Sequence, residues 1–419
     1  KKHFVGLFDK LFQKGLDFQR KNCKEPVGCV DIQLATSCAM LFKSLFTKEN
    51  GVNFDAAQKD VAPMLKVIDK LFAFSFIWSV GASIDAKGQE QFDYWARERF
   101  DEAGLQLNMP PSDTVYDYWV NIAEDKFKGW KEIVAEYTFD PTAQYTSIMV
   151  PTADTTKFGW LQKKLITVNK PFFFTGVTGT GKTVCVQNLL KSLEPLKEDG
   201  GLGLVPMSIG FSAQTLSMVV QLTIEGKLEK KRKTLLGAPA GRKVVIFVDD
   251  INMPIVEEYG AQPPVELLRQ FLDFKGFYDR DKLFWKDLID TLLFTGAAPP
   301  GGGRSEVTPR FTRHFNVMCI PPTSNDSMTV IFKAIVEGFL SNKFDAELKK
   351  LSKGLVAGAI EVYNRISTEL LPTPAKFHYT FNLRDVSKVF PGLPTIDSRK
   401  CKQPVTPPRP WTHARHPPP

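Results

Sequence analysis

The chain has 419 residues, of which 43% are hydrophobic and 24% are charged. This composition is ordinary for a globular protein and leaves room for two or three domains. The formal net charge is +8, but residues 391–419 contain five basic residues and one acidic residue and carry half of it. Because the remaining body is close to neutral, we expect no nucleic-acid partner. The longest apolar run, Leu71–Val80, is shorter than the about 20 residues that span a bilayer, so we expect no membrane partner.

The cysteines bear on the cellular compartment of the chain, and the first residue bears on whether it is a fragment. The six cysteines show neither C-x-x-C pairs nor neighbouring histidines, so the sequence predicts no zinc site and no disulfide framework. We expect reduced thiols in a cytosolic chain. The chain begins with Lys1 rather than Met, and we expect a fragment or a processed product.

Residues 1–105 are predicted to be helical. Apolar residues recur at helical spacing over Lys1–Phe46, with an interruption at Pro26. An apolar segment over Val61–Ile84 and a charged helix over Lys87–Ala103 follow. No phosphate loop or other catalytic pattern occurs in this part of the chain. We therefore expect these helices to be the C-terminal, structural part of a domain whose N-terminal part is missing from this chain.

The pattern changes to alternating strands and helices over residues 158–340. Residues 106–157 lead into it; they are rich in Pro, Tyr and Trp, and their scarcity of Gly and Ser favours an ordered connector. The predicted elements are a helix over Gly159–Thr167, a strand over Pro171–Thr175, a helix from Lys182, and strands over Lys243–Val248, Thr291–Gly296 and His314–Ile320. Such alternation predicts an α/β fold with a mostly parallel sheet covered by helices on both faces.

The last part of the chain is predicted to be helical and then disordered. Helices are expected over Ser327–Leu340 and Asp345–Leu370, with a short one from Asn382, which gives a helical small subdomain over residues 341–390. Residues 391–419 are rich in proline and lack apolar periodicity. We expect a disordered basic tail there, although a proline-motif ligand is an alternative.

A phosphate-loop pattern begins at Gly176. Gly-Val-Thr-Gly-Thr-Gly-Lys-Thr matches G-x-x-x-x-G-K-[ST] in full, after an apolar strand and at the start of a helix. The glycines let backbone N–H groups turn toward phosphates, and the helix N-terminus favours anions. The expected nucleotide-binding residues are Gly176, Val177, Thr178, Gly179, Thr180, Gly181, Lys182 and Thr183. Lys182 would contact the β- and γ-phosphates of ATP, and the Thr183 hydroxyl would ligate Mg²⁺. The alternative is a glycine-rich turn that arises by chance.

An acidic pair follows the strand Lys243–Val248. Asp249 is expected to project from the carboxyl end of the sheet toward Mg²⁺, where ligands of open α/β sheets bind. Asp250 occupies the position of a general base for the attacking water. Many phosphate-loop ATPases have Glu there, and the shorter Asp leaves a greater distance to the water. The alternative is a pair of capping aspartates at the end of a strand.

Three arginines and two alanines complete the candidate site. Ala297 and Ala298 stand at a strand end where many related ATPases have a polar residue that orients water, so binding is the safer expectation than rapid hydrolysis. Arg313, and less favourably Arg310, precedes an apolar strand and is a candidate arginine finger toward a neighbouring domain's nucleotide. The alternative is a surface salt-bridge cluster. Arg384 opens the last helix and is a candidate to fold back onto the nucleotide.

These stretches together resemble dynein heavy chains, a family of AAA+ motors, and they are more similar to the axonemal than to the cytoplasmic type. The phrases that carry the resemblance are Val248–Pro254, Tyr259–Pro264, Glu266–Gln270, Pro299–Arg304, Val307–Phe311, Arg313–Phe315 and His378–Asp385. Phe76–Ala82 resembles the segment that joins the second and third ring modules, and Val150–Asp154 resembles the entry to the third. The resemblance covers about residues 60–390 and, more weakly, residues 1–60, and we expect it to end at Phe390.

The resemblance implies an AAA+ P-loop NTPase fold flanked by helical small subdomains. Residues 1–105 would be the rear of the second module, with the large and small parts of the third module at 158–340 and 341–390. It implies ATP and Mg²⁺ as cofactors. Lys182, Thr183 and Asp249 would bind Mg-ATP, and Asp250 would be the base. Arg384 would be the small-domain sensor, and Arg313 would be the finger toward the second module.

The resemblance also implies a function for the whole protein, an ATP-driven, minus-end-directed microtubule motor of cilia or flagella. Its partners would be the other AAA+ modules of the same heavy chain, dynein intermediate and light chains, and microtubules through regions that this chain lacks. The third module of the ring would be a nucleotide-responsive regulator.

Three functions remain open on the sequence. The first is a motor module that hydrolyses ATP, and the second is a regulatory module that binds ATP without hydrolysing it, as Asp250 and Ala298 favour. The third is a nucleic-acid-linked P-loop enzyme such as a helicase or clamp loader. The near-neutral body and the dynein-like phrases count against this third function.

Overall fold

The computed structural model describes residues 1–55, 60–140, 148–343, 349–373 and 381–390, together with Lys376 and Tyr379. It consists of two compact units. The first comprises Lys1–Trp130, Lys157–Val177 and Gly181–Pro321, and the second comprises Lys131–Thr156, Thr178–Thr180 and the chain from Pro322 onward. The tail predicted at 391–419 lies outside the described residues.

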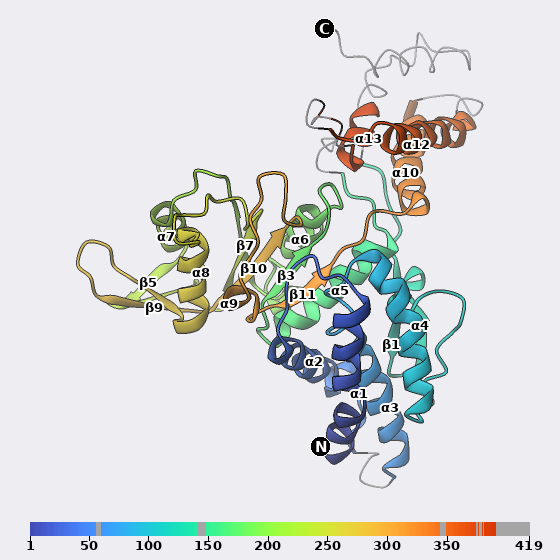
Figure 1. The fold of residues 1–419 in the computed structure, drawn as a ribbon, viewed down its shortest axis with the longest axis horizontal. Helices are drawn as coiled ribbons and strands as arrows, with labels where there is room; N and C mark the ends of the chain where they lie inside the picture. The colour runs from blue at the N-terminus through green and yellow to red at the C-terminus, as the bar shows by residue number, and fades with distance from the viewer. Residues whose placement is uncertain are drawn as a thin grey trace. The chain divides into compact units, whose positions relative to one another are not determined.

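The N-terminal part of the first unit is a group of packed helices (Figure 1). They are α1 (Lys2–Asn22), α2 (Asp31–Leu45), α3 (Ala62–Ile77) and α4 (Ala86–Glu102), and they confirm the helices predicted there. Both α1 and α2 pack against α3, whose residues Leu71–Ile77 are all buried. A helix that is apolar on every side belongs in a core. The buried ring of Phe76 lies 5.9 Å from the rings of both Phe92 and Phe100.

The described part of the segment after α4 contains a hairpin that was not predicted. Strands β1 (Tyr118–Asn121) and β2 (Lys126–Gly129) pair antiparallel. The short helices η3 (Val115–Asp117) and η4 (Trp130–Ile133) flank it. The indole N–H of Trp130 donates to the Tyr116 carbonyl at 3.0 Å, and the Tyr116 hydroxyl donates to the Gly81 carbonyl at 2.8 Å. These two bonds join the hairpin to the end of the helical group.

The centre of the first unit is a parallel sheet. Within the described residues its order is β11-β3-β10-β7-β4. The strands are β3 (Phe172–Thr175), β4 (Leu204–Gly210), β7 (Lys243–Asp249), β10 (Thr291–Ala297) and β11 (Asn316–Cys319). Helices α5 (Ala153–Thr167) and α6 (Lys182–Ser192) flank β3 in the sequence. Every residue of β3 and β11 is buried. Because successive side chains point to opposite faces, both faces of the sheet are covered.

A smaller sheet extends the first unit and was not predicted. Its order in the described part of the chain is β5-β6-β9-β8. The strands are β5 (Glu229–Arg232), β6 (Leu235–Gly237), β8 (Gly276–Tyr278) and β9 (Trp285–Ile289), and the nearby helices are α7 (Ser217–Glu225), α8 (Pro263–Phe274) and α9 (Pro309–Thr312). Its strands are short, and all residues of β5 are exposed. Such strands carry no apolar alternation that a sequence pattern could detect.

Hydrogen bonds join the N-terminal helices to the parallel sheet. The Gln33 side chain on α2 donates to the Phe315 carbonyl at 3.1 Å, and the Cys319 N–H on β11 donates to the Ala82 carbonyl at 2.6 Å. Residues 1–130 therefore belong to one compact unit with the α/β segment. The five cysteines in the described part of the chain are free thiols. None of the described helices combines the length and apolar character needed to cross a membrane.

The second unit is helical, as predicted. Its helices are α10 (Asn325–Lys343), α12 (Leu351–Glu369) and α13 (Leu383–Val389). They share a core that includes Phe332, Val336 and Phe390, and the rings of Phe332 and Phe390 stack 4.7 Å apart. The helix start predicted at Asp345 lies outside the described residues.

A pair of glycine substitutions on α1 tests the packing of the helical group. A Cβ at Gly15 would lie 2.4 Å from the ring of Phe76, which is fully buried and cannot move away, whereas a Cβ at Gly6 would meet nothing within 4 Å. We expect Gly15→Ala to lower the free energy of unfolding by about 1–3 kcal/mol through overpacking. Gly6→Ala should raise it by about 0.5–1 kcal/mol through helix propensity. Chemical denaturation of the full chain measures both, and equal effects of the two variants would contradict the packing described.

Candidate nucleotide-binding site

The predicted phosphate loop forms the turn between β3 and α6. Its glycines have left-handed backbones, with φ of 145° at Gly176, 86° at Gly179 and 81° at Gly181. A Cβ at Gly176 would also lie 2.5 Å from the carbonyl oxygen of Ile320, so that position is closed to other residues. The strand, turn and helix therefore stand in the order that the motif requires.

Lys182 and Thr183 begin α6 and point to different partners. The Lys182 ammonium is buried and donates to the carbonyls of Gly176 and Val177, both at 2.8 Å. The Thr183 hydroxyl donates to Asp249 Oδ2 at the end of β7. This bond joins the phosphate loop to the acidic pair, which the sequence placed 66 residues apart. The structure thus brings Thr183, next to Lys182, into contact with Asp249, and the binding of Mg-ATP by these residues stays a prediction.

Asp250 follows the strand in an unusual backbone conformation. Its φ is 51°, and its N–H donates to Asp249 Oδ1 at 3.1 Å. Its side chain is 43% exposed, so water can reach the carboxylate, and one of its oxygens lies 3.9 Å from Arg304 Nε. The position suits a base that faces solvent, with a cation beside it.

The end of β10 carries no polar side chain, as the sequence indicated. Ala297 and Ala298 are both buried. The Ala298 carbonyl instead accepts a hydrogen bond from the Asn252 side chain at 2.9 Å. Asn252 and Arg304 are parts of this site to which the sequence assigned no role. The one feature of the sequence that pointed to them is that they lie in two of the dynein-like segments, Val248–Pro254 and Pro299–Arg304.

The candidate arginine finger Arg313 is held in an ion-pair cluster. Its guanidinium donates to Asp273 on α8 at 2.7 Å, and the His314 ring nitrogen lies 3.1 Å from the same oxygen. Partial burial alone would raise the pKa of the Asp273 carboxyl, but the hydrogen bond from Arg313 and the charges of His314 and Arg313 hold that pKa below its usual value. The Arg313 side chain remains 48% exposed. It is therefore oriented by α8 and also accessible from outside.

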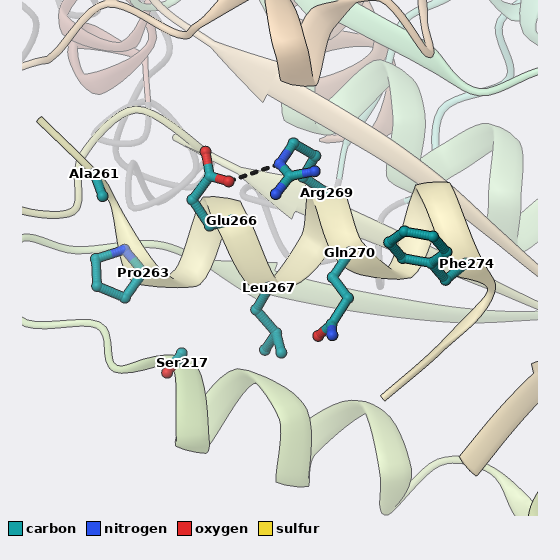
Figure 2. Close-up of a pocket in the computed structure, with 8 residues that line it drawn as sticks. All are labelled: Ser217, Ala261, Pro263, Glu266, Leu267, Arg269, Gln270 and Phe274. Carbon is teal, nitrogen blue, oxygen red and sulfur yellow. Dashed lines mark hydrogen bonds and ion pairs between the residues drawn. The ribbon is translucent and has the colours of Figure 1, made fainter. Parts of the chain in front are cut away.

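The same cluster continues along α8. Arg269 donates to Glu266 at 2.6 Å, as Figure 2 shows, and to Asp273 at 2.8 Å. Arg310, the second finger candidate, lies 3.6 Å from Glu266 and is 67% exposed. An open pocket lies beside this helix, and Leu267 and Gln270 point from α8 toward α7. None of its lining residues belongs to the phosphate loop or the acidic pair, so the pocket is separate from the predicted chemistry.

Arg384 stands in the second unit at the start of α13. Its side chain is exposed, and its backbone N–H donates to the Asn382 side chain, which caps the helix, at 2.8 Å. Its contact with nucleotide stays a prediction.

The donor set fits Mg²⁺ and a nucleotide phosphate. A hydroxyl and a carboxylate side by side, Thr183 and Asp249, are the hard oxygen ligands that Mg²⁺ prefers. Glycines with positive φ and a lysine folded into the same turn are the arrangement that surrounds phosphate oxygens. These residues could hold Mg²⁺ and the phosphates of one nucleotide.

Three family models match the chain. They are described as "P-loop containing dynein motor region", matched over residues 137–323, "Dynein heavy chain AAA lid domain", over 4–132, and "AAA+ lid domain", over 355–416. The last match runs past Phe390, so our expectation that the resemblance ends there is wrong. The similarity beyond Phe390 was not detected because residues 391–416 are rich in proline and lack the apolar periodicity by which a helical lid is recognised.

Individual relatives match along almost the whole chain. Human dynein axonemal heavy chain 6 is 39% identical over 403 residues, which are 96% of this chain and 10% of the relative. Human dynein axonemal heavy chain 1 is 36% identical over 443 residues, 98% of this chain and 10% of the relative. Mouse dynein axonemal heavy chain 12 is 41% identical over 412 residues, 93% of this chain and 13% of the relative.

The chain thus spans about a tenth of the length of the relatives it matches and carries their motor-region and lid signatures. The parallel sheet, the phosphate loop and the helical lid also confirm the AAA+ P-loop fold expected from the sequence. The chain belongs to the dynein heavy-chain family, in its axonemal type.

Proposed function

We propose that this chain contains a Mg-ATP-binding AAA+ module that hydrolyses ATP within a dynein motor. The observation that supports this best is the bond from Thr183 to Asp249. In this bond a hydroxyl and a carboxylate, both suitable ligands for Mg²⁺, lie together at the carboxyl edge of the sheet and next to the buried Lys182. A glycine-rich turn that arose by chance would not be expected to lie in contact with the acidic residues at the end of a distant strand.

Each residue has a defined role in this proposal. The backbone of the loop and Lys182 bind the phosphates of ATP, and Thr183 and Asp249 hold Mg²⁺. When bound, Mg²⁺ neutralises charge on the phosphate oxygens. Asp250 accepts a proton from the water whose oxygen attacks the terminal phosphorus, and the bond to the departing ADP oxygen breaks. The exposed Asp250 carboxylate can receive that water.

A second candidate function is regulatory binding without turnover. Two observations favour it: Ala297 and Ala298 leave the strand end without a side chain that could orient water, and Asp250 is shorter than the Glu that many related ATPases use. In this case ATP would only stabilise one arrangement of neighbouring modules.

The similarity to dynein heavy chains supports a proposal for the whole protein. The chain would be part of an ATP-driven, minus-end-directed microtubule motor in the axoneme of cilia or flagella, as the axonemal relatives suggest. Residues 1–105 would be the rear of the second module, and 158–390 the third. Arg313, exposed and oriented by Asp273, would reach the nucleotide of the second module, and Arg384 would sense nucleotide in its own. Other modules of the heavy chain, intermediate and light chains, and microtubules would be the partners.

Replacement of Lys182 tests nucleotide binding. We expect Lys182→Ala to weaken Mg-ATP binding by about 100-fold, because two or more charge-assisted hydrogen bonds to phosphate are lost. Titration calorimetry on the full chain measures the affinity. Lys191→Ala, an exposed lysine in the last turn of the same helix, is the matched control and should bind as the wild type does. Unchanged binding by Lys182→Ala would refute a phosphate-loop role.

Replacement of Asp250 separates hydrolysis from binding. Asn has nearly the same volume as Asp and tolerates a positive φ, but it cannot accept the proton. We expect Asp250→Asn to bind Mg-ATP as tightly as the wild type, and to release phosphate at least about 100-fold more slowly in a single turnover. Wild-type protein that binds ATP without releasing phosphate would instead establish the regulatory function.

A further inference from the structure

The loop after β10 is a rigid turn that ends in Arg304. Gly301 and Arg304 form an isolated antiparallel bridge, with N–H to carbonyl distances of 3.0 and 3.2 Å. The two residues between them, Gly302 and Gly303, have φ of 59° and 84°. Positive φ at both central positions is what a tight primed turn requires, and glycine adopts it without strain. The turn therefore fixes the direction in which the Arg304 side chain leaves the backbone.

Asn252 attaches this loop to the acidic pair. Its side-chain N–H donates to the Ala298 carbonyl at 2.9 Å, and its backbone carbonyl accepts from the Ser305 N–H at 3.0 Å. Both ends of the loop are thus bonded to a residue that is 1% exposed and lies two positions after Asp250. This arrangement holds Arg304 beside the end of β7.

Arg304 presents a cation whose inner nitrogen lacks an acceptor. Its side chain is 23% exposed, and its Nε is buried with no hydrogen-bond partner among the described residues. The carboxylate oxygen Asp250 Oδ1 lies 3.9 Å from this nitrogen, beyond hydrogen-bond range. A buried charged donor without an acceptor is costly, so such a group calls for a bound anion.

We propose that Arg304 contacts the terminal phosphate of ATP from within the same module and so distinguishes ATP from ADP. This inference rests on the proposed function, since it assumes that the loop binds the nucleotide. The guanidinium stands beside Asp250. If Asp250 receives the attacking water, as the proposed function requires, the terminal phosphate would lie on the same side. The guanidinium supplies the polar contact that Ala297 and Ala298 cannot make. An arginine suits this task because its planar fork binds two phosphate oxygens at once.

The test compares the affinities of the full chain for ATP and ADP in the presence of Mg²⁺. We expect Arg304→Gln to weaken ATP binding by about tenfold or more while ADP binding stays unchanged. Arg304→Lys keeps the positive charge but lacks the planar guanidinium that can bind two oxygens. It should lose less ATP affinity than Arg304→Gln and keep its ADP affinity. Arg242→Gln is the matched control, because Arg242 is exposed at the opposite, amino end of β7.

Each other outcome overturns the inference. Equal loss of ATP and ADP affinity would mean that Arg304 only shapes its loop, and no loss would mean that it contacts no phosphate. If Arg304→Gln melts at a lower temperature than the wild type, the ATP and ADP affinities of Arg304→Lys are compared instead. A loss for ATP alone supports the inference, and an equal loss for both nucleotides or no loss overturns it. Wild-type protein that binds neither nucleotide would refute the proposed function as well, whereas wild-type binding with no selective effect of Arg304→Gln refutes this inference alone.

Discussion

The hydrogen bond between Thr183 and Asp249 reaches across a strand. Thr183 begins the helix that follows β3, and Asp249 ends β7, but β10 lies between these two strands in the sheet. Small residues at the end of β10 leave room for this bond. A Cβ at Gly296 would lie 3.2 Å from the Asp249 carboxylate, so the absence of a side chain there keeps the carboxylate free of a close contact. The two alanines that follow are small as well. The lack of a polar side chain at this strand end is thus compatible with the closeness of Thr183 and Asp249.

The arginine-bearing segment 309–316 is fixed from two directions. On one side it is bonded to the N-terminal part of the chain. The Thr312 hydroxyl donates to the Gly28 carbonyl at 3.0 Å, and the Gln33 side chain on α2 donates to the Phe315 carbonyl. On the other side, the Arg313 side chain donates to Asp273 on α8. The position of this arginine therefore depends on residues from two distant parts of the sequence. A change in the N-terminal helices would reach it through the backbone without any contact with nucleotide.

The sequence predicted those elements whose signal is local and strong. The helices α1–α3 and the buried strands β3, β7 and β10 follow from apolar patterns, and α4 follows from a charged helical pattern. The bond between the phosphate loop and the acidic pair follows from two motifs whose meeting point is set by parallel-sheet topology. β4 was missed because Pro206 and mixed burial interrupt its pattern, and the small sheet was missed because its strands are short and partly exposed. The place of Arg304 beside Asp250 depends on a turn and on the Asn252 side chain. Sequence spacing contains neither kind of information.

The left-handed backbone at Asp250 favours certain residue types at that position. Glycine, asparagine and aspartate are the residues that adopt such a conformation readily. Of these three, only aspartate has a carboxylate. Glutamate would reach farther toward water, but this backbone conformation suits it less well. The short acid in this module therefore agrees with the geometry of the main chain after β7.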